Sequence, residues 1–384
     1  MTAKRIYRIA RIGGDGIGPE VVAQASRVAE AAGRAWGFDI RWTDYPFGAG
    51  HYLETGEILP ESALDEFAGH DALLLGAIGD PAVKPGILEQ GILLKLRFHF
   101  DQYVNLRPSK SLPRVPLPVK AGSVDIVVVR ENTEDFYMNL GGISGGKAFE
   151  IDFEASRRAY DLKGKVSLAF EPACRAAVQL GIATEAGVRR ITEYACKTAK
   201  ARNEDEIVLA SKSNALSWIY GFWEETAKDE AAGHGVECSV ANVDALCYHL
   251  VRDPGRYGVI LTPNMFGDIV SDLLAGIAGG LGTAAGANIG EGLSMFEPVH
   301  GSAPDIAGTG RANPVAAILS GAVMLRHLGE TGAAGAVEKA VEGFLSESDS
   351  GDLPFEFGGT APVFRVGEAI ADRITMERSD ASCS

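Results

Sequence analysis

A strand-like segment that turns into an acidic helix constrains this chain more than any other stretch. The apolar run 257–261 leads through Pro263 and Asn264 into a segment with helical character. That segment carries Asp268 and Asp272, and aspartates four residues apart lie on one face of a helix. The pair is either a solvated helix face, which is the commoner case, or a cation site. Apolar neighbours without Lys or Arg at helical spacing favour the cation, and oxygen ligands favour Mg²⁺ or Mn²⁺ over zinc.

Short apolar strands alternate with amphipathic helices from the N-terminus onward. Residues 4–12 predict a strand and residues 20–35 an Ala-rich helix. This alternation favours an α/β fold with largely parallel sheets. The turn between these two elements has glycines spaced G-x-G-x-G over residues 14–18, which is neither the dinucleotide pattern G-x-G-x-x-G nor a P-loop. We therefore do not expect a Rossmann fold.

Composition limits the class of protein. The 384 residues suffice for two domains, and 46% apolar with 23% charged residues is ordinary for a globular enzyme. A formal net charge of −15 argues against nucleic-acid binding. No signal peptide is recognisable, and no apolar run reaches the roughly 18 residues that a bilayer requires. Five cysteines without C-x-x-C spacing fit a reducing compartment. We expect a cytoplasmic protein with no nucleic-acid or membrane partner.

Three arginines stand at or near the ends of predicted elements. Arg97 lies on a helical segment and Arg107 follows it, whereas Arg130 follows the apolar strand 125–129. Each alone is more often a surface residue. Brought together, three guanidinium groups could bind a di- or tricarboxylate bidentately and reverse the negative potential of the chain locally.

Three further residues have both a purely structural and a functional interpretation. Lys212 follows a predicted strand and is either a surface lysine or a group poised for proton transfer. Asp244 opens the predicted helix 245–251, where an N-cap role is the better bet on statistics alone. The loop 296–314 contains Asp305, whose carboxylate could accept from both hydroxyls of an adenosine ribose and would repel a 2′-phosphate.

These motifs occur in the order found in one enzyme family. From about residue 9 to 328 the chain resembles the metal-dependent β-decarboxylating dehydrogenases, which include isopropylmalate, isocitrate, tartrate and D-malate dehydrogenases. The residues that carry the resemblance are Gly14 to Glu20, Arg97, Arg107, Arg130, Tyr137, Lys212, Asn214, Asp244, Asn264 to Asp272, and Glu297 to Asn313.

The resemblance implies an NAD- and Mg²⁺- or Mn²⁺-dependent oxidative decarboxylation of an (R)-malate-type 2-hydroxy acid. Asp268 and Asp272, with Asp244 of the partner subunit, would hold the metal. Lys212 of the partner subunit would help remove the hydroxyl proton while C2 gives hydride to NAD, and Tyr137 would protonate the enolate left by decarboxylation. Whether a monovalent cation also binds stays open. The other implied sites are Arg97, Arg107, Arg130, Gln90 and Leu93 for substrate, and Asn214, Glu297, His300, Gly301, Ser302, Ala303, Asp305 and Asn313 for cofactor.

The identity of the substrate stays open at this point. Residues 100–108 and 130–134 are most similar to tartrate/D-malate dehydrogenase. In the family, the segment that corresponds to residues 87–93 contacts the substituent on C3 of the substrate. Here this segment matches neither the tartrate/D-malate dehydrogenase pattern nor the isopropylmalate dehydrogenase pattern. Tartrate or D-malate is the first expectation, and 3-isopropylmalate or another 3-substituted malate, including isocitrate or homoisocitrate, is the alternative.

The resemblance also implies a two-domain isopropylmalate/isocitrate dehydrogenase-like fold, each domain a sheet flanked by helices, with an active-site cleft between them. The first, cofactor-binding domain would comprise residues 1–102 and 279–384. The second, for dimerisation and metal binding, would comprise residues 103–278 with an arm at about 141–188. Shared sites imply a homodimer. The tail after Arg373 is expected to be disordered.

Two rival classes of function have weaker support. A Mg²⁺-dependent phosphoryl-transfer enzyme also needs carboxylates, arginines and glycine loops, but the chain has no P-loop or kinase signature. A non-catalytic regulatory subunit could lose its catalytic groups, whereas Lys212, Tyr137 and all three aspartates are present.

Overall fold

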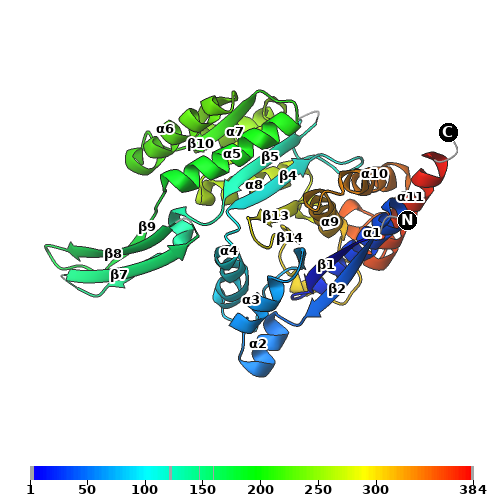
Figure 1. The fold of residues 1–384 in the computed structure, drawn as a ribbon, viewed down its shortest axis with the longest axis horizontal. Helices are drawn as coiled ribbons and strands as arrows, with labels where there is room; N and C mark the ends of the chain where they lie inside the picture. The colour runs from blue at the N-terminus through cyan, green and yellow to red at the C-terminus, as the bar shows by residue number, and fades with distance from the viewer. Residues whose placement is uncertain (1–3, 121–122, 147, 159, 382–384) are drawn as a thin grey trace. The chain divides into compact units, whose positions relative to one another are not determined.

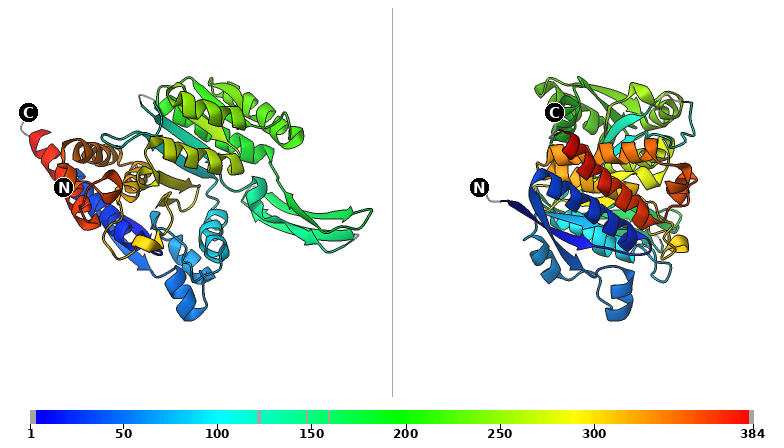
Figure 2. Two further views of the ribbon diagram at one scale, coloured as in Figure 1. Left: turned by 180° about the vertical axis from the view of Figure 1, so that it is seen from behind. Right: turned by 90° about the vertical axis from the view of Figure 1, so that its right-hand side faces the viewer.

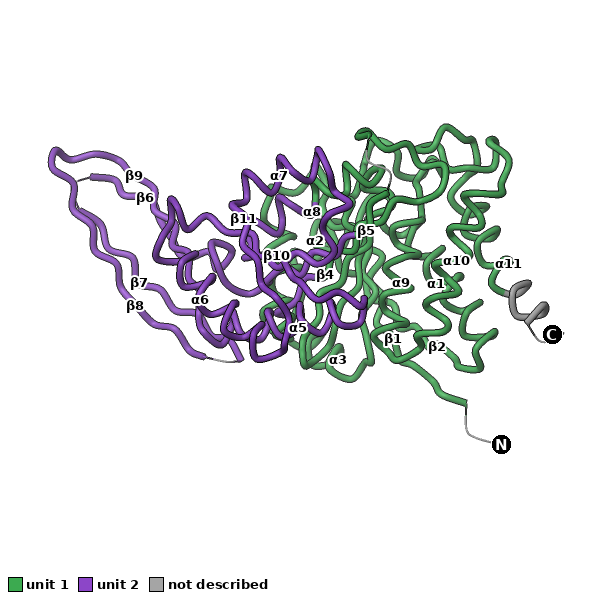
Figure 3. Tube along the Cα trace, turned by 90° about the horizontal axis from the view of Figure 1, so that it is seen from above, with its two compact units in different colours: residues 1–102, 106–125, 272–384 green, residues 103–105, 126–271 purple. Residues whose placement is uncertain are grey.

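A computed structural model describes residues 4–120, 123–146, 148–158 and 160–381. The chain is mixed α/β and divides into two compact units (Figure 3). Unit 1 comprises residues 1–102, 106–125 and 272–384, and unit 2 comprises residues 103–105 and 126–271. The predicted α/β class of sheets flanked by helices is confirmed.

Unit 1 is built on strands in the order β4-β13-β14-β3-β1-β2. Strand β1 is parallel to β2 and β3, β14 is parallel to β3, and β13 is antiparallel to β14. All four residues of β3, Ala-Leu-Leu-Leu, are buried, as expected for a strand covered on both faces. The strands are β1 Arg5–Ile12, β2 Phe38–Tyr45, β3 Ala72–Leu75, β4 Val104–Lys110, β13 Ala285–Ile289 and β14 Met295–Pro298.

Four helices of unit 1, α1, α9, α10 and α11, pack against one another (Figures 1 and 2). Helix α1 begins at Gly18-Pro19 and ends at Trp36, and the following Gly37 has a φ of 81°, which suits a left-handed cap. The helices are α1 Gly18–Trp36, α2 Ala49–Thr55, α3 Glu61–Phe67, α4 Lys95–His99, α9 Val315–His327, α10 Thr331–Glu347 and α11 Val363–Ala381. A π-helical turn, Glu89–Leu94, precedes α4.

The glycine turn after β1 is packed by backbone against two other loops. Gly14 and Gly16 have φ of 74° and 57°. A Cβ at Gly16 would lie 2.0 Å from the carbonyl oxygen of Ser302, and one at Gly14 would lie 2.2 Å from that of Ala77. The backbone N–H of Ile17 donates to Ser302 O at 2.9 Å. These glycines therefore allow close approach of the loop 300–303 to the start of α1.

Unit 2 contains four parallel strands in the order β11-β10-β12-β5. Because the strands are parallel, their carboxyl ends lie at one edge of the sheet. The elements are β5 Asp125–Glu131, α5 Glu185–Ala201, β10 Glu206–Ser211, α6 Ser217–Gly233, β11 Glu237–Asn242, α7 Val243–Arg252, β12 Val259–Thr262 and α8 Asn264–Ala278. Helix α8 continues past Ser271, the last residue assigned to unit 2.

The segment predicted as an arm forms two antiparallel ladders, which project as a long hairpin in Figure 1. Residues alternate between exposed and half-buried along β7 and β8. The strands are β6 Leu140–Ser144, β7 Ala148–Arg157, β8 Tyr160–Ala169 and β9 Ala176–Leu180.

Two expectations about chain organisation differ from the structure. Helix α11 runs to Ala381, so the predicted disorder after Arg373 is wrong for residues 374–381. Residues 382–384 lie outside the described part of the chain. The segment 106–125 groups with unit 1, whereas the resemblance assigned it to the second domain. Among the described residues no helix is long and apolar enough to cross a membrane.

Candidate active site

The carboxyl ends of the four parallel strands of unit 2 carry most of the residues predicted to be catalytic. Arg130 is in register with Thr262, the last residue of β12, and α8 starts two residues later. Ser211 is in register with Asn242, so Lys212 and Asp244 follow neighbouring strands. Parallel pairing thus brings together segments that are far apart in the sequence.

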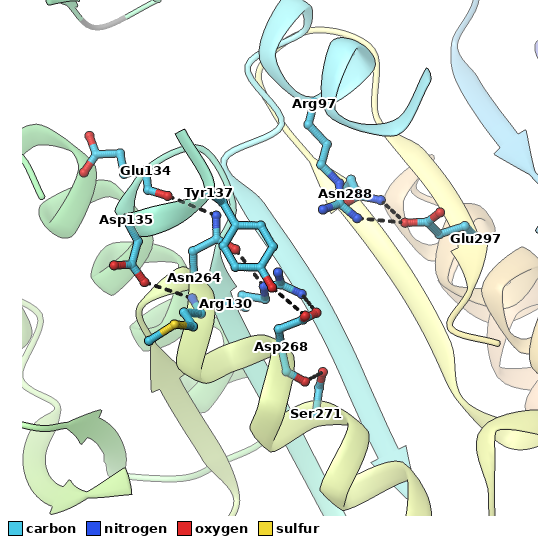
Figure 4. Close-up of polar contacts among 11 residues, drawn as sticks. Arg97, Arg130, Glu134, Asp135, Tyr137, Asn264, Asp268, Ser271, Asn288 and Glu297 are labelled. Carbon is cyan, nitrogen blue, oxygen red and sulfur yellow. Dashed lines mark hydrogen bonds and ion pairs between the residues drawn. The ribbon is translucent and has the colours of Figure 1, made fainter. Parts of the chain in front are cut away.

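Arg130 is almost fully buried and binds two residues of α8 (Figure 4). Its Nε donates to Asn264 Oδ1 at 2.9 Å, and its Nη1 forms an ion pair with Asp268 Oδ1. A Cβ at Gly267 would lie 2.4 Å from Arg130 Cγ, so glycine is required there. One of the two aspartates of the predicted pair therefore has a counter-ion that the helix itself does not supply.

Tyr137 reaches the other oxygen of the same carboxylate. Its hydroxyl donates to Asp268 Oδ2 at 2.7 Å, and the guanidinium carbon of Arg130 lies 5.1 Å from the centre of the tyrosine ring. A cation–π contact of this kind favours the charged arginine beside the ring. Arg130, Tyr137 and Asp268, predicted separately from the sequence, form one cluster.

A run of buried polar residues begins in the last two residues of β5 and continues beyond the strand. Residues 130–135 are Arg-Glu-Asn-Thr-Glu-Asp, and each is at most 2% exposed. Glu131 accepts from the N–H and hydroxyl of Thr133 and from the N–H of Glu134. Burial, reinforced by the negative charge of Glu134, raises the pKa of Glu131 to about 7. Sequence reasoning noted residues 130–134 for their resemblance but did not predict that they are buried, because six polar residues in succession ordinarily indicate a solvated loop.

Lys212 and Asp244 form an ion pair of 2.8 Å. The hydrogen bond from Lys212 holds the pKa of Asp244 below its usual range. Within the described part of a single chain, no three Asp, Glu, His or Cys side chains come close enough to hold a metal ion. Asp244 therefore does not join Asp268 and Asp272, the two metal ligands expected on α8, in the same chain. The oxygen donors of α8 suit Mg²⁺ or Mn²⁺ in kind.

Arg97 of unit 1 lies on α4 and is held by a buried carboxylate. Glu297 Oε1 accepts from Arg97 Nη2 at 3.3 Å and from Asn288 Nδ2 at 2.7 Å (Figure 4). Glu297 was expected to bind cofactor, and the structure shows it bound to the arginine. Arg107 lies on β4, is also buried, and passes Gly286, where an added Cβ would be 3.5 Å from its Nε.

Leu93 and Leu94 are half-buried at the end of the π-helical turn that precedes Arg97. Leu94 precedes Arg97 by three residues and Leu93 precedes it by four, so both lie about one helical turn before it along the chain. Leu93 packs against the core of unit 1, whereas Gln90 is exposed. Isolated π-turns occur frequently at functional sites.

A cavity of about 340 Å³ in unit 1 contains part of the predicted cofactor set. His300, Ala303 and Asn313 line it. Burial lowers the pKa of His300, which keeps its ring neutral. The other lining residues, which sequence reasoning missed, are Ile17, Leu281, Gly282, Ile306, Arg311, Phe355 and Glu356.

The remaining residues of the predicted cofactor set do not line this cavity. Gly301 and Ser302 belong to the loop that contacts the start of α1, and Asp305 is exposed on a short 3₁₀ turn, Pro304–Ile306. Asn214 belongs to unit 2, where it is exposed after β10.

Known proteins similar to this chain belong to one enzyme family. The family model described as isocitrate/isopropylmalate dehydrogenase matches residues 8–363. A 3-isopropylmalate dehydrogenase of Mycobacterium sp. (strain KMS) is 43% identical over 372 residues, 95% of this chain and 98% of that protein. One of Clavibacter sepedonicus is 44% identical over 91% of this chain and 94% of that protein.

Two solved structures are similar over nearly the whole chain. Isocitrate dehydrogenase from Methylococcus capsulatus has a TM-score of 0.79 at 33% identity, covering 96% of this chain and 99% of that one. A beta-decarboxylating dehydrogenase from Thermococcus kodakarensis, in its apo form, has a TM-score of 0.74 at 35% identity, covering 97% of both chains. The chain therefore belongs to the isocitrate/isopropylmalate dehydrogenase family and is an NAD-linked decarboxylating dehydrogenase that uses Mg²⁺ or Mn²⁺.

Proposed function

We propose that this enzyme oxidatively decarboxylates a 3-substituted (R)-malate and that 3-isopropylmalate is its substrate. The observation that carries the proposal is the half-buried Leu94 at the end of the π-helical turn, three residues before the buried Arg97. An arginine that binds a carboxylate, with apolar surface one turn away, fits an acid that carries an alkyl group on C3. Relatives named 3-isopropylmalate dehydrogenase support the same substrate. Tartrate and D-malate, the first expectation from the sequence, have no such support.

Each cluster has a proposed role in this reaction. Arg97, Arg107 and Arg130 bind the carboxylate that is to leave. Tyr137 holds the proton that goes to the enolate, and Lys212 accepts the proton of the substrate hydroxyl. Asp268 and Asp272 would hold the metal, which when bound would supply Lewis acidity toward the oxygen atoms of the substrate.

We propose that Lys212 and Asp244 act in the site of a partner subunit, so that a homodimer is the active species. A single chain brings no third metal ligand to α8 among its described residues. The helices that follow β10 and β11 expose apolar side chains that a partner could cover: Trp218, 93% exposed, and Phe222 on α6, with Tyr248 and Val251 on α7.

We propose that the cavity beside His300 and Asn313 binds the adenosine part of NAD. A neutral imidazole and apolar side chains such as Ile17 suit stacking on a purine, and the Asn313 amide suits its polar edge. Asp305 would disfavour a 2′-phosphate, so NAD is expected to be preferred over NADP. The described cysteines are free thiols, which supports a cytoplasmic location.

The substrate proposal is tested by following NADH formation with Mn²⁺ and a panel of acids. The panel contains 3-isopropylmalate, D-malate, tartrate, isocitrate and homoisocitrate, each with NAD and with NADP. The highest kcat/KM is expected for 3-isopropylmalate with NAD. A higher value for D-malate or tartrate would overturn the substrate assignment, and turnover of none of the acids would overturn the proposed function.

Substituting Leu94 tests the apolar surface directly. Leu94→Gln is expected to lower kcat/KM for 3-isopropylmalate roughly ten- to hundredfold, because a polar group would face the alkyl substituent, and to leave D-malate turnover unchanged. Leu53→Gln is the matched control, since Leu53 is exposed on α2 of the same unit. Equal losses for both acids would contradict the assignment of Leu94 to the C3 substituent.

A further inference from the structure

A short 3₁₀ turn that carries Tyr137, Asp135–Met138, is joined to the first residues of α8 at three points (Figure 4). The three contacts are Asn264 Nδ2 to Glu134 O at 3.2 Å, Met265 N to Asp135 Oδ2 at 2.9 Å, and Tyr137 Oη to Asp268 Oδ2 at 2.7 Å. Residues 134–137 therefore lie directly against residues 264–268 of α8. A shift of one would shift the other.

Asp135, the first residue of this turn, is a buried acidic residue with an unfavourable backbone conformation. It is 2% exposed and its φ is 63°, in the left-handed region. Its backbone N–H donates to Ile182 O at 2.8 Å, which holds the residue in that conformation. Aspartate tolerates left-handed backbone better than most residues, but glycine adopts it without cost. Burial of the carboxylate and the left-handed backbone are both unfavourable, so we expect a compensating contact of the Asp135 side chain.

That contact is with the N-terminal end of α8. The first N–H groups of a helix have no partner within the helix, and a negative charge near them is favourable. The first turn of α8 contains no acidic residue. Asp135 supplies an acidic acceptor to this turn from another segment, through the bond that it accepts from Met265 N.

We propose that Asp135 is a positioning residue: its carboxylate fixes the start of α8 against the tyrosine turn, so that Asp268 and Tyr137 are presented together. This inference rests on the proposed function, which assigns Asp268 to the metal and Tyr137 to proton transfer. Asp135 acts through both of these residues and does not itself contact substrate. Groups held in place before a ligand binds lose less freedom when it does.

Three variants separate this role from backbone strain and from general stability. Asp135→Gly removes the cap and also relieves the left-handed backbone. Asp135→Asn keeps an acceptor oxygen and tolerates the same backbone. Asn139→Gly is the matched control, since Asn139 has a φ of 57° directly after the same turn and is exposed.

The first measurement is Mn²⁺ binding to the full-length protein without substrate, well below the melting temperature. Asp135→Gly is expected to raise the Mn²⁺ dissociation constant roughly five- to thirtyfold, the range that loss of a helix cap produces, and to lower kcat. Asp135→Asn is expected to stay within about threefold of the wild type, and Asn139→Gly to be unchanged. Wild-type Mn²⁺ affinity in Asp135→Gly would overturn the proposal, even if its melting temperature fell.

Amide hydrogen exchange provides a readout that does not depend on metal or turnover. In Asp135→Gly the amides of residues 265–268 are expected to exchange faster, with no comparable change in Asn139→Gly. Unchanged exchange at residues 265–268 would overturn the positioning role. If the wild type turned over none of the acids, the proposed function would fail, while faster exchange in Asp135→Gly would still support the link between the turn and α8.

Discussion

Arg130 and Asp268 form an ion pair in which the arginine side chain is 1% exposed and the aspartate side chain is 44% exposed. The buried partner is fixed by its second bond to Asn264, whereas the exposed carboxylate faces solvent on one side. Asp268 is thus compensated by a positive charge and still accessible to a cation. The pair places the arginine proposed to bind the substrate carboxylate in direct contact with the aspartate proposed to bind the metal.

Arg130→Lys tests this arrangement. Lysine keeps the charge but loses the planar fork, so it cannot bind Asn264 and Asp268 together with a substrate carboxylate. We expect kcat/KM to fall about 100-fold, mainly through a higher KM for the acid, because about 3 kcal/mol of charge-assisted bonding is lost. Steady-state kinetics at saturating NAD and Mn²⁺ measures this.

Arg11→Lys is the matched control for that substitution. Arg11 binds both carboxylate oxygens of Asp44 through its own guanidinium fork and is not among the residues assigned to substrate. Its kinetics should remain those of the wild type. A comparable loss in both variants, or none in Arg130→Lys, would refute the assigned role of Arg130.

Lys212→Met should abolish turnover without affecting cofactor affinity. The thioether cannot accept a proton, and general-base catalysis commonly contributes at least about a hundredfold. NAD binding, measured by calorimetry, should be nearly intact. Lys197→Met is the control, because Lys197 pairs with Glu193 on the surface of α5. Full activity in Lys212→Met would remove this lysine from the mechanism.

Glu356→Ala should weaken NAD binding. Glu356 accepts from Asn313 Nδ2 at 2.8 Å in the wall of the proposed adenosine cavity, so its loss removes one of the bonds that orient the Asn313 amide. We expect the dissociation constant of NAD to rise roughly five- to tenfold, the effect of one hydrogen bond, with Mn²⁺ affinity unchanged. Glu368→Ala, which removes a surface partner of Arg365, should bind NAD normally. An unaltered NAD affinity in Glu356→Ala would place the adenosine elsewhere.

Local patterns predicted the elements that position the site. The apolar strand and the helix with Asp268 appear as β12 and α8, and the strand before Arg130 appears as β5. These elements could be read from sequence because periodicity and turn residues are properties of neighbouring positions.

Contacts between distant segments could not be predicted in this way. The helix of Asp268 has no basic residue at helical spacing, yet Arg130 neutralises that aspartate from a strand 138 positions earlier in the chain. This contact follows from the pairing of β5 with β12, in which Arg130 is opposite Thr262. Phe355 and Glu356 likewise reach the cavity from near the C-terminus, where local sequence shows no cofactor motif. Only the three-dimensional pairing of elements reveals such residues.

The buried Glu131 carboxyl predicts an unusual dependence of stability on pH. Its pKa is raised to about 7 by burial and by the neighbouring charge of Glu134. A carboxyl whose pKa is higher in the folded than in the unfolded state contributes stability below the unfolded value, near 4.5, and loses it as pH rises to about 7. The full contribution is at most about 3 kcal/mol.

Glu131→Gln removes the titration and retains an acceptor oxygen for Thr133. The stability of the wild type relative to this variant should therefore fall steadily between about pH 4.5 and 7 and remain constant above that range, because the wild type must then carry a buried negative charge. Urea unfolding at closely spaced pH values, analysed as the difference between the two proteins, cancels the titration of all other groups that the substitution leaves unchanged. A difference that does not vary with pH would show that Glu131 titrates at its ordinary value. A difference that grows as pH rises would show instead that donors such as Thr133 stabilise the ionised form more than burial destabilises it.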